Sequence, residues 1–120
     1  QLGYERLIVI TDAMAAMGMP VGKYKLGDYE VFVDETSARL ANGTLAGSIV
    51  TLDQAIRNLS AWTGCMLEDA ILCATETPAR SLGLEGKGRL EVGMDADLVL
   101  LTPQGQVVKT IVAGELIYSA

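Results

Sequence analysis

The run Leu7–Ile10 is the sequence feature that most limits how this chain can fold. Its four apolar residues, three of them β-branched, follow one another without a polar interruption. Such a run is typical of a strand that is buried on both faces, as in a parallel sheet. We therefore predict a strand over Arg6–Ile10, which needs partners on both faces and both edges. This need is a first indication that the 120 residues are part of something larger.

A small antiparallel sheet is expected after the loop Thr11–Gly22, which includes one helical turn over Asp12–Met17. Turn dipeptides separate the three strands that we expect here. The predicted strands are Tyr24–Leu26, Tyr29–Val33 and Thr36–Leu40, with turns at Gly27-Asp28 and Asn42-Gly43.

Three helices are predicted next, followed by a β ribbon. Thr51 and Gln54 fit a capping box that begins the first helix, and Gly64 can end it. The second helix covers about Leu67–Thr75. The third has Thr77 as its N-cap and Pro78 as its first residue, and ends at Gly83. The predicted ribbon has strands at Leu98–Leu101, Gln106–Val112 and Glu115–Tyr118.

Composition excludes several classes of function. The formal net charge is −6 and the nine basic residues are scattered, which argues against nucleic-acid binding. No apolar run approaches the roughly 20 residues that span a bilayer, so no membrane association is expected. The segment Gln1–Arg6 has no basic head before an apolar stretch, so we expect no signal peptide. Cys65 and Cys73 match no common zinc or redox spacing and are read as reduced thiols of a cytoplasmic protein.

Asp12 is the main candidate for chemistry, and the pattern allows two interpretations. An aspartate after a strand, followed by Ala, Met and a glycine stop at Gly18, can cap a helical turn. A carboxylate at the carboxyl end of a barrel strand can instead be a general base. It would need a water acidified by a metal, and a chain without histidine offers no self-contained zinc site of the usual kind.

Two further groups of residues invite a functional interpretation. Asp95 and Asp97 could form a carboxylate pair for acid–base work, but carboxylates beside a turn before a strand more often cap it and stay solvated. The small residues of Gly43–Ser48 allow backbone N–H groups to approach a ligand, above all an anion. The P-loop ending is absent there, and a tight loop-to-helix turn is the commoner explanation.

Three stretches together resemble the C-terminal third of the N-acetylglucosamine-6-phosphate deacetylase family of amidohydrolases. VITDAMAAMG (Val9–Gly18) resembles the family's eighth barrel strand with its catalytic aspartate. RLANGTLAGSIVTLDQAIRNL (Arg39–Leu59) resembles the loop and helix beyond it. ATETPARSLGL (Ala74–Leu84) and GMDADLVLL (Gly93–Leu101) are shared more widely among amidohydrolases.

The resemblance implies an α/β fold, a C-terminal fragment of a (β/α)₈ TIM-type barrel plus part of a small β-sandwich. Residues 1–87 would be the last part of the barrel, and residues 88–120 would belong to the sandwich. A whole barrel takes roughly 250 residues, so this chain cannot contain one. Where the family usually has small turn residues and an aspartate, this chain has Glu35 and Val21, so the local geometry of the β region is in question.

The resemblance also implies a reaction, the hydrolysis of N-acetylglucosamine 6-phosphate to glucosamine 6-phosphate and acetate. Asp12 would be the catalytic base, and Leu45 would contact the sugar-phosphate substrate, mainly through its backbone. A divalent metal, zinc or similar, would be held by a glutamate and histidines upstream of Gln1. We expect no metal ligand within this chain and no activity of the chain alone.

A homodimer is expected as well, because unpaired apolar strands and helix faces drive association. Strands of one copy would complete sheets of the other, and Ile8 and Ile10 would then be buried. Two alternatives stay open. The chain could be a non-catalytic oligomerisation module that folds alone, or it could belong to another amidohydrolase, such as a dihydroorotase-like enzyme.

Overall fold

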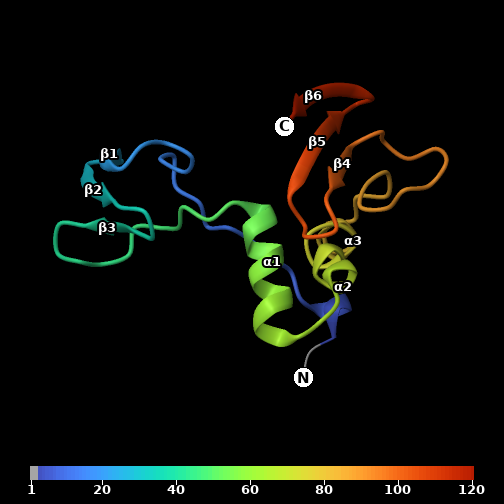
Figure 1. Cartoon of the computed structure of the whole chain (residues 1–120), viewed down its shortest axis with the longest axis horizontal. Coiled ribbons are helices and arrows are strands. Elements are labelled where there is room, and N and C mark those ends of the chain that lie inside the picture. The colour runs from blue at the N-terminus through green and yellow to red at the C-terminus, as the bar shows by residue number, and fades with distance from the viewer. Residues whose placement is uncertain (1–2) are drawn as a thin grey trace. The chain divides into compact units, whose positions relative to one another are not determined.

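The computed structural model describes residues 3–120, and the chain divides into two compact units. One unit comprises residues 1–9 and 52–120, and the other comprises residues 10–51. Each unit has a three-stranded antiparallel sheet of its own (Figure 1).

The unit of residues 10–51 is built on strands β1 (Gly22–Leu26), β2 (Tyr29–Val33) and β3 (Ala38–Leu40), in that spatial order. This is the predicted sheet, with β3 two residues shorter at its start. Alternation along β2 turns Val31 and Val33 inward, where both are buried. The remaining members of this core are Met14, Ala16, Ala38 and Ala46, with Tyr24, Leu40 and Ile49 packed against them.

Asp34 holds the turn between β2 and β3. Its carboxylate accepts hydrogen bonds from the backbone N–H groups of Thr36 and Ser37, both at 2.7 Å, and from both hydroxyls. These bonds, the Thr36 backbone bond first, lower the pKa of Asp34 to about 2. Among the described residues only Asp12 and Ala113 have positive φ without being glycine. Glu35 therefore fits this turn without the glycine that the family pattern suggests.

The helices of the other unit are α1 (Leu52–Thr63), α2 (Leu67–Leu72) and α3 (Glu76–Ser81), preceded by the 3₁₀ turn η1 (Tyr4–Arg6). Within residues 3–120, no helix is long and apolar enough to span a membrane. The predicted role of Gln54 is wrong, because its side chain donates to Asn58 and accepts from Arg57 instead of folding back.

The predicted start of the third helix is also wrong. The helix begins at Glu76, with Thr75 as N-cap. The Thr77 hydroxyl is used elsewhere, because it donates to the Tyr4 carbonyl at 3.1 Å from a buried position. The second helix ends three residues earlier than predicted, and its last turn continues as irregular turns through Thr75.

The predicted strand Arg6–Ile10 does not form. Arg6 ends η1, Leu7 is extended, and residues 7–10 belong to no strand. The Val9 N–H donates instead to the Cys73 carbonyl at 2.9 Å. The physical reason is the missing neighbour, since a strand edge needs a partner to form a ladder. Ile8 and Ile10 are 40% and 75% exposed. The expected burial of these two side chains is therefore not found in the single chain, and we do not propose strand exchange between two copies.

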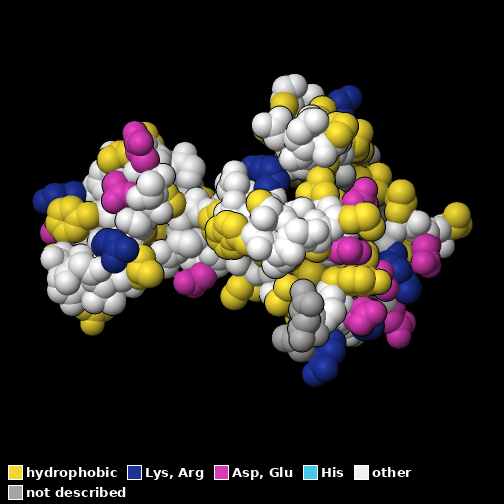
Figure 2. Space-filling model, turned by 60° about the horizontal axis from the view of Figure 1, so that its bottom comes forward, with side chains coloured by type: hydrophobic (Ala, Val, Ile, Leu, Met, Phe, Trp, Pro, Cys, Tyr) yellow, Lys and Arg dark blue, Asp and Glu magenta, His cyan; other side chains and the backbone are white. Residues whose placement is uncertain are grey.

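The second sheet consists of β4 (Leu98–Leu101), β5 (Val107–Val112) and β6 (Glu115–Ser119), in that order. This is the predicted ribbon. Arg57 of α1 ties the β4–β5 turn to the helices, donating to the Gly105 carbonyl at 2.7 Å while it pairs with Asp53. Figure 2 shows apolar side chains on the surface. On this sheet they include Val99, Leu100, Leu116, Ile117 and Tyr118.

Gly88 is a position where only glycine fits, because φ is +88° and an added Cβ would lie 2.8 Å from the Ala79 Cβ. We predict that Gly88→Ala lowers the free energy of unfolding more than Gly93→Ala does. Gly93 has φ +94° but nothing within 4 Å, so alanine there meets backbone strain of about 1–2 kcal/mol alone. The clash at Gly88 should add about 1–3 kcal/mol, measured by urea unfolding. Equal midpoints would show that the close approach is absent.

Candidate functional site

Asp12 lies in the unit of residues 10–51, at the start of a short stretch that pairs with residues just before α1. Its backbone is left-handed, with φ 49°. A non-glycine residue held in this region costs of order 1–3 kcal/mol, and such residues cluster at functional sites. Its side chain is exposed, and within residues 3–120 it makes no hydrogen bond or ion pair. An unpaired, exposed carboxylate on a constrained backbone is available to act on a ligand.

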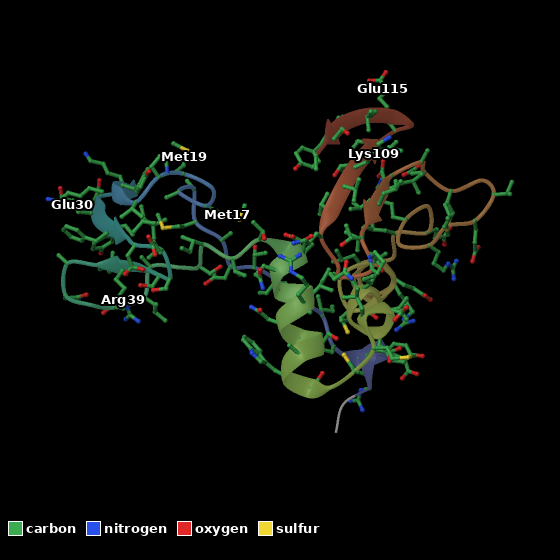
Figure 3. The ribbon with its side chains drawn as sticks, in the orientation of Figure 1. Met17, Met19, Glu30, Arg39, Lys109 and Glu115 are labelled. Atoms are coloured by element: carbon green, nitrogen blue, oxygen red, sulfur yellow. The ribbon has the colours of Figure 1, made fainter. Side chains whose placement is uncertain are left out.

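The alternative role of Asp12 as a helix cap is not found. Residues 15–18 form turns and not a helix, with Met17 N–H bonded to the Met14 carbonyl at 3.0 Å. The Ala13 N–H bonds to the Thr11 hydroxyl at 3.2 Å and not to Asp12. The Met17 and Met19 side chains that follow are exposed (Figure 3). The predicted helical turn over Asp12–Met17 is thus wrong, because Asp12 has a positive φ and the Met14 N–H is bonded to the distant Ser48 carbonyl.

Ser48 is the direct partner of the Asp12 backbone. A parallel bridge joins Ala13 and Ser48. The Ser48 N–H donates to the Asp12 carbonyl at 2.7 Å, and the Met14 N–H donates to the Ser48 carbonyl at 2.9 Å. The Ser48 hydroxyl donates to the Thr11 carbonyl. In the sequence Ser48 stands out only as one of the small residues of a predicted turn, because its hydroxyl bonds to a residue 37 positions away.

Gly47 allows this close pairing. Its φ is +113°, and an added Cβ would lie 3.0 Å from the Asp12 carbonyl oxygen. That distance is shorter than an ordinary carbon–oxygen contact, so a side chain at this position would push the two segments apart. The glycine brings the predicted ligand-binding stretch Gly43–Ser48 and the predicted catalytic residue Asp12 to adjacent backbone positions.

Leu45 lies two residues before Gly47, in an antiparallel bridge with Arg39. Its side chain is 62% exposed. The N–H groups of Thr44, Ala46 and Ser48 are all bonded, to Asn42 Oδ1, the Ala38 carbonyl and the Asp12 carbonyl. Within residues 3–120, those of Leu45 and Gly47 make no hydrogen bond. The stretch therefore offers two backbone donors to a ligand, close in sequence to the partner of Asp12.

Arg39 holds the loop that leads into this stretch. Its guanidinium Nη1 donates to the Gly43 carbonyl at 2.8 Å. The Asn42-Gly43 turn is closed by the Gly43 N–H on the Leu40 carbonyl, also at 2.8 Å. Figure 3 labels Arg39 on β3. Both contacts fix the backbone before Leu45.

Asp95 and Asp97 have structural partners, which favours the structural interpretation of this pair. Lys87 Nζ lies 2.8 Å from Asp95 Oδ2 and 2.5 Å from Asp97 Oδ2. Asp97 Oδ1 accepts the Ala113 N–H at 2.8 Å in the β5–β6 turn. The Ala113 backbone bond first, and then Lys87, lower the pKa of Asp97. Hydrogen bonds to Asp95 and then Asp97 raise the pKa of Lys87, because they stabilise its charged form.

Cys65 and Cys73 are free thiols, as expected. Cys73 is buried, and burial raises its pKa, which disfavours the reactive thiolate. Its Sγ lies 3.4 Å from the Asp69 carbonyl oxygen. Cys73 therefore packs as a small apolar residue.

No metal centre can be built from the described residues. Residues 3–120 contain no group of three or more His, Cys, Asp or Glu side chains able to hold a metal ion. A groove of about 760 Å³ lies between α2, α3 and the start of β4, lined among others by Leu72, Pro78, Leu90 and Val99. Its charged lining includes Lys87, Asp95 and Asp97, which pair with one another. Neither Asp12 nor Leu45 lines this groove.

The chain is similar to amidohydrolases in sequence and in structure. A family model described as "Amidohydrolase family" matches residues 13–117. The curated N-acetylglucosamine-6-phosphate deacetylase of Lysinibacillus sphaericus is 46% identical over 114 residues, which are 95% of this chain and 30% of that protein. The chain thus spans about a third of the curated relatives that it matches.

Two solved structures are similar over almost the whole chain. The crystal structure of N-acetylglucosamine-6-phosphate deacetylase from Thermotoga maritima matches with a TM-score of 0.90 and 36% identity, covering 98% of this chain and 32% of that one. A mutant of the Mycobacterium smegmatis enzyme, in complex with N-acetyl-D-glucosamine-6-phosphate, matches with a TM-score of 0.86 and 41% identity. It covers 98% of this chain and 32% of that one.

The role of Asp97 can be tested through the pH dependence of stability. A carboxyl with a lowered pKa stabilises the fold above its unfolded pKa, about 3.9, and that stability is lost as pH falls through the folded pKa. Asp97→Asn should therefore lower the unfolding midpoint between about pH 5 and 8, with the difference from the unmodified chain vanishing in more acidic solution.

Asp28→Asn is the matched control for Asp97→Asn. Asp28 is exposed in the β1–β2 turn, and within residues 3–120 its carboxylate has no hydrogen bond or ion pair. Its substitution should leave the midpoint unchanged at every pH. If Asp97→Asn also leaves the midpoint unchanged at every pH, Asp97 does not have the structural role assigned to it.

Proposed function

This chain belongs to the amidohydrolase family, and on that premise we propose that it is the C-terminal part of a hydrolase that deacetylates N-acetylglucosamine 6-phosphate. The products would be glucosamine 6-phosphate and acetate. The observation that carries the proposal is Asp12, an exposed carboxylate on a left-handed backbone. The deacetylases to which the chain is similar match it over 95% or more of its length in the comparisons given above.

Asp12 would act as the general base. A carboxylate that no protein group occupies can accept the proton of the attacking water and return it to the amine that leaves. Oxygen from the water ends on the acetate, and the nitrogen of the amide leaves as the amino group of the sugar. The constrained backbone supports this role, because a base must stand at a fixed distance from the proton that it takes.

Leu45 would contact the substrate through its backbone. Its N–H and that of Gly47 are the donors that the sheet leaves unused. Hydroxyl or phosphate oxygens of a sugar phosphate are suitable acceptors for such donors. The exposed Leu45 side chain would cover an apolar part of the sugar ring.

A divalent metal is the cofactor that amidohydrolases generally use, but the residues of this chain are not suited to hold one. The sequence contains no histidine, and the described residues form no metal-binding cluster. Ligands for zinc or a similar ion would have to come from another part of the whole protein. The roles proposed for Asp12 and Leu45 therefore do not include binding the metal.

The wider architecture of the whole protein is part of the same proposal. We infer a (β/α)₈ barrel that ends within residues 1–87, and a small β-sandwich that includes residues 88–120. Residues 7–10 would become the eighth barrel strand once upstream strands lie beside them, which accounts for the exposed Ile8 and Ile10. A homodimer and a cytoplasmic location, both expected from the sequence, stay predictions.

Asp12→Asn in the whole protein tests the assignment of the base. Asparagine keeps the shape of the side chain and also tolerates the left-handed region, but it cannot accept the proton. We predict a folded protein with unchanged metal content and a kcat lower by about 10²–10⁴-fold, measured as acetate release. Near-normal kcat in this variant would sink the proposed role of Asp12.

The chain by itself tests the alternative of an independent module. We predict that purified residues 1–120 release no acetate from N-acetylglucosamine 6-phosphate with zinc or any other added divalent ion. The reason is that the sequence has no histidine and the described residues form no metal-binding cluster. The whole protein assayed in parallel is the positive control. Metal-dependent turnover by the 120 residues at an ordinary enzymatic rate would contradict the prediction. No turnover by the whole protein would favour the non-catalytic module.

A further inference from the structure

We propose that Ser48 is the positioning residue for Asp12, holding the catalytic backbone in its left-handed conformation. The inference rests on the proposed function, because Asp12 must be the base for its position to matter. It goes beyond that function in assigning a role to a residue that touches neither the substrate nor the reacting atoms.

Ser48 hydrogen-bonds to the peptide groups on both sides of Asp12. The Ser48 hydroxyl donates to the Thr11 carbonyl, which belongs to the peptide group before Asp12. The Ser48 N–H donates to the Asp12 carbonyl at 2.7 Å, which belongs to the peptide group after it. A residue's φ and ψ are the rotations between its two flanking peptide planes. Anchoring both planes to Ser48 therefore fixes both dihedral angles of Asp12.

The strain at Asp12 explains why such an anchor is needed. Without it, an aspartate would relax from φ 49° toward the broad regions at negative φ. Relaxation would rotate the Cα–Cβ bond and carry the carboxylate away from its position. Because the base works only within hydrogen-bond reach of the water, a displacement of about 1 Å can cost on the order of 10²-fold in rate.

Ser48 is itself held in place. Its carbonyl accepts the Met14 N–H at 2.9 Å, and its hydroxyl also accepts the Val50 N–H at 3.2 Å. The hydroxyl thus has one donor and one acceptor partner, which leaves it little freedom to rotate. Met14 is buried in the core of residues 10–51, so the anchor is continuous with packed side chains.

Ser48→Ala tests the hydrogen bonds of the hydroxyl apart from those of the Ser48 backbone. Alanine keeps the N–H and the carbonyl but releases the Thr11 peptide plane. In the whole protein we expect kcat to fall by about 10- to 100-fold, with KM changed by less than about threefold, because the substrate contacts are untouched. Ser48→Thr keeps the hydroxyl and should recover most of the lost kcat.

Ser60→Ala is the matched control. The Ser60 hydroxyl also donates to a backbone carbonyl, that of Cys65 at 2.7 Å, and it is partly buried like Ser48. Removing it deletes a comparable hydrogen bond in the other unit. Its kcat should stay normal, whatever its effect on the unfolding midpoint. Equal kcat losses in Ser48→Ala and Ser60→Ala would overturn the inference.

A double variant tests whether Ser48 acts through Asp12. If it does, Asp12→Asn with Ser48→Ala should lose no more kcat than Asp12→Asn alone, since there is no base left to position. Multiplying losses would indicate an independent structural effect and overturn the proposal. If Ser48→Ala keeps full kcat while Asp12→Asn does not, the positioning role fails and the proposed function stands. An unmodified protein without deacetylase activity would be a failure of the proposed function itself.

Discussion

The pairing of Ser48 with the backbone around Asp12 is the interaction on which the candidate site depends. It joins two segments that are 37 positions apart in the sequence, and Gly47 permits the approach because a side chain there would strike the Asp12 carbonyl. The sheet β1–β2–β3 sits between these segments in the chain and closes the loop that brings them together. Met14 and Ala46, which flank the paired residues in sequence, belong to the same buried core as Val31.

The chemistry of the site follows from which groups this arrangement leaves unused. Backbone hydrogen bonds occupy the N–H groups of Ala46 and Ser48. Within residues 3–120 the N–H groups of Leu45 and Gly47 have no partner, so they can bind a ligand. The Asp12 carboxylate is exposed for the same reason, since its own backbone bonds hold it without involving the side chain. The carboxylates with strong internal partners, Asp34 and Asp97, shape turns instead.

Several large apolar side chains are exposed in the part of the chain that the structure describes. Residues 7–10 and the edges of the β4–β5–β6 sheet have the composition of buried structure but pair with no further strand in the described residues. Ile10, at 75% exposed, illustrates that an apolar run forms no strand where no neighbouring strand pairs with it.

By itself, the sequence determined the elements that local patterns govern. The turn dipeptides and alternating residues predicted both antiparallel sheets, and the apolar stripe predicted α1, because these signals act within a few residues. It also singled out Asp12 and Leu45 by their motifs. Only the tertiary structure decided that Asp12 has a left-handed backbone and that Ser48 hydrogen-bonds to both peptide groups that flank it. The same holds for Thr77, which bonds to Tyr4 instead of capping α3. These features depend on contacts between distant segments, and no local pattern of residue types encodes which distant carbonyl a hydroxyl will meet.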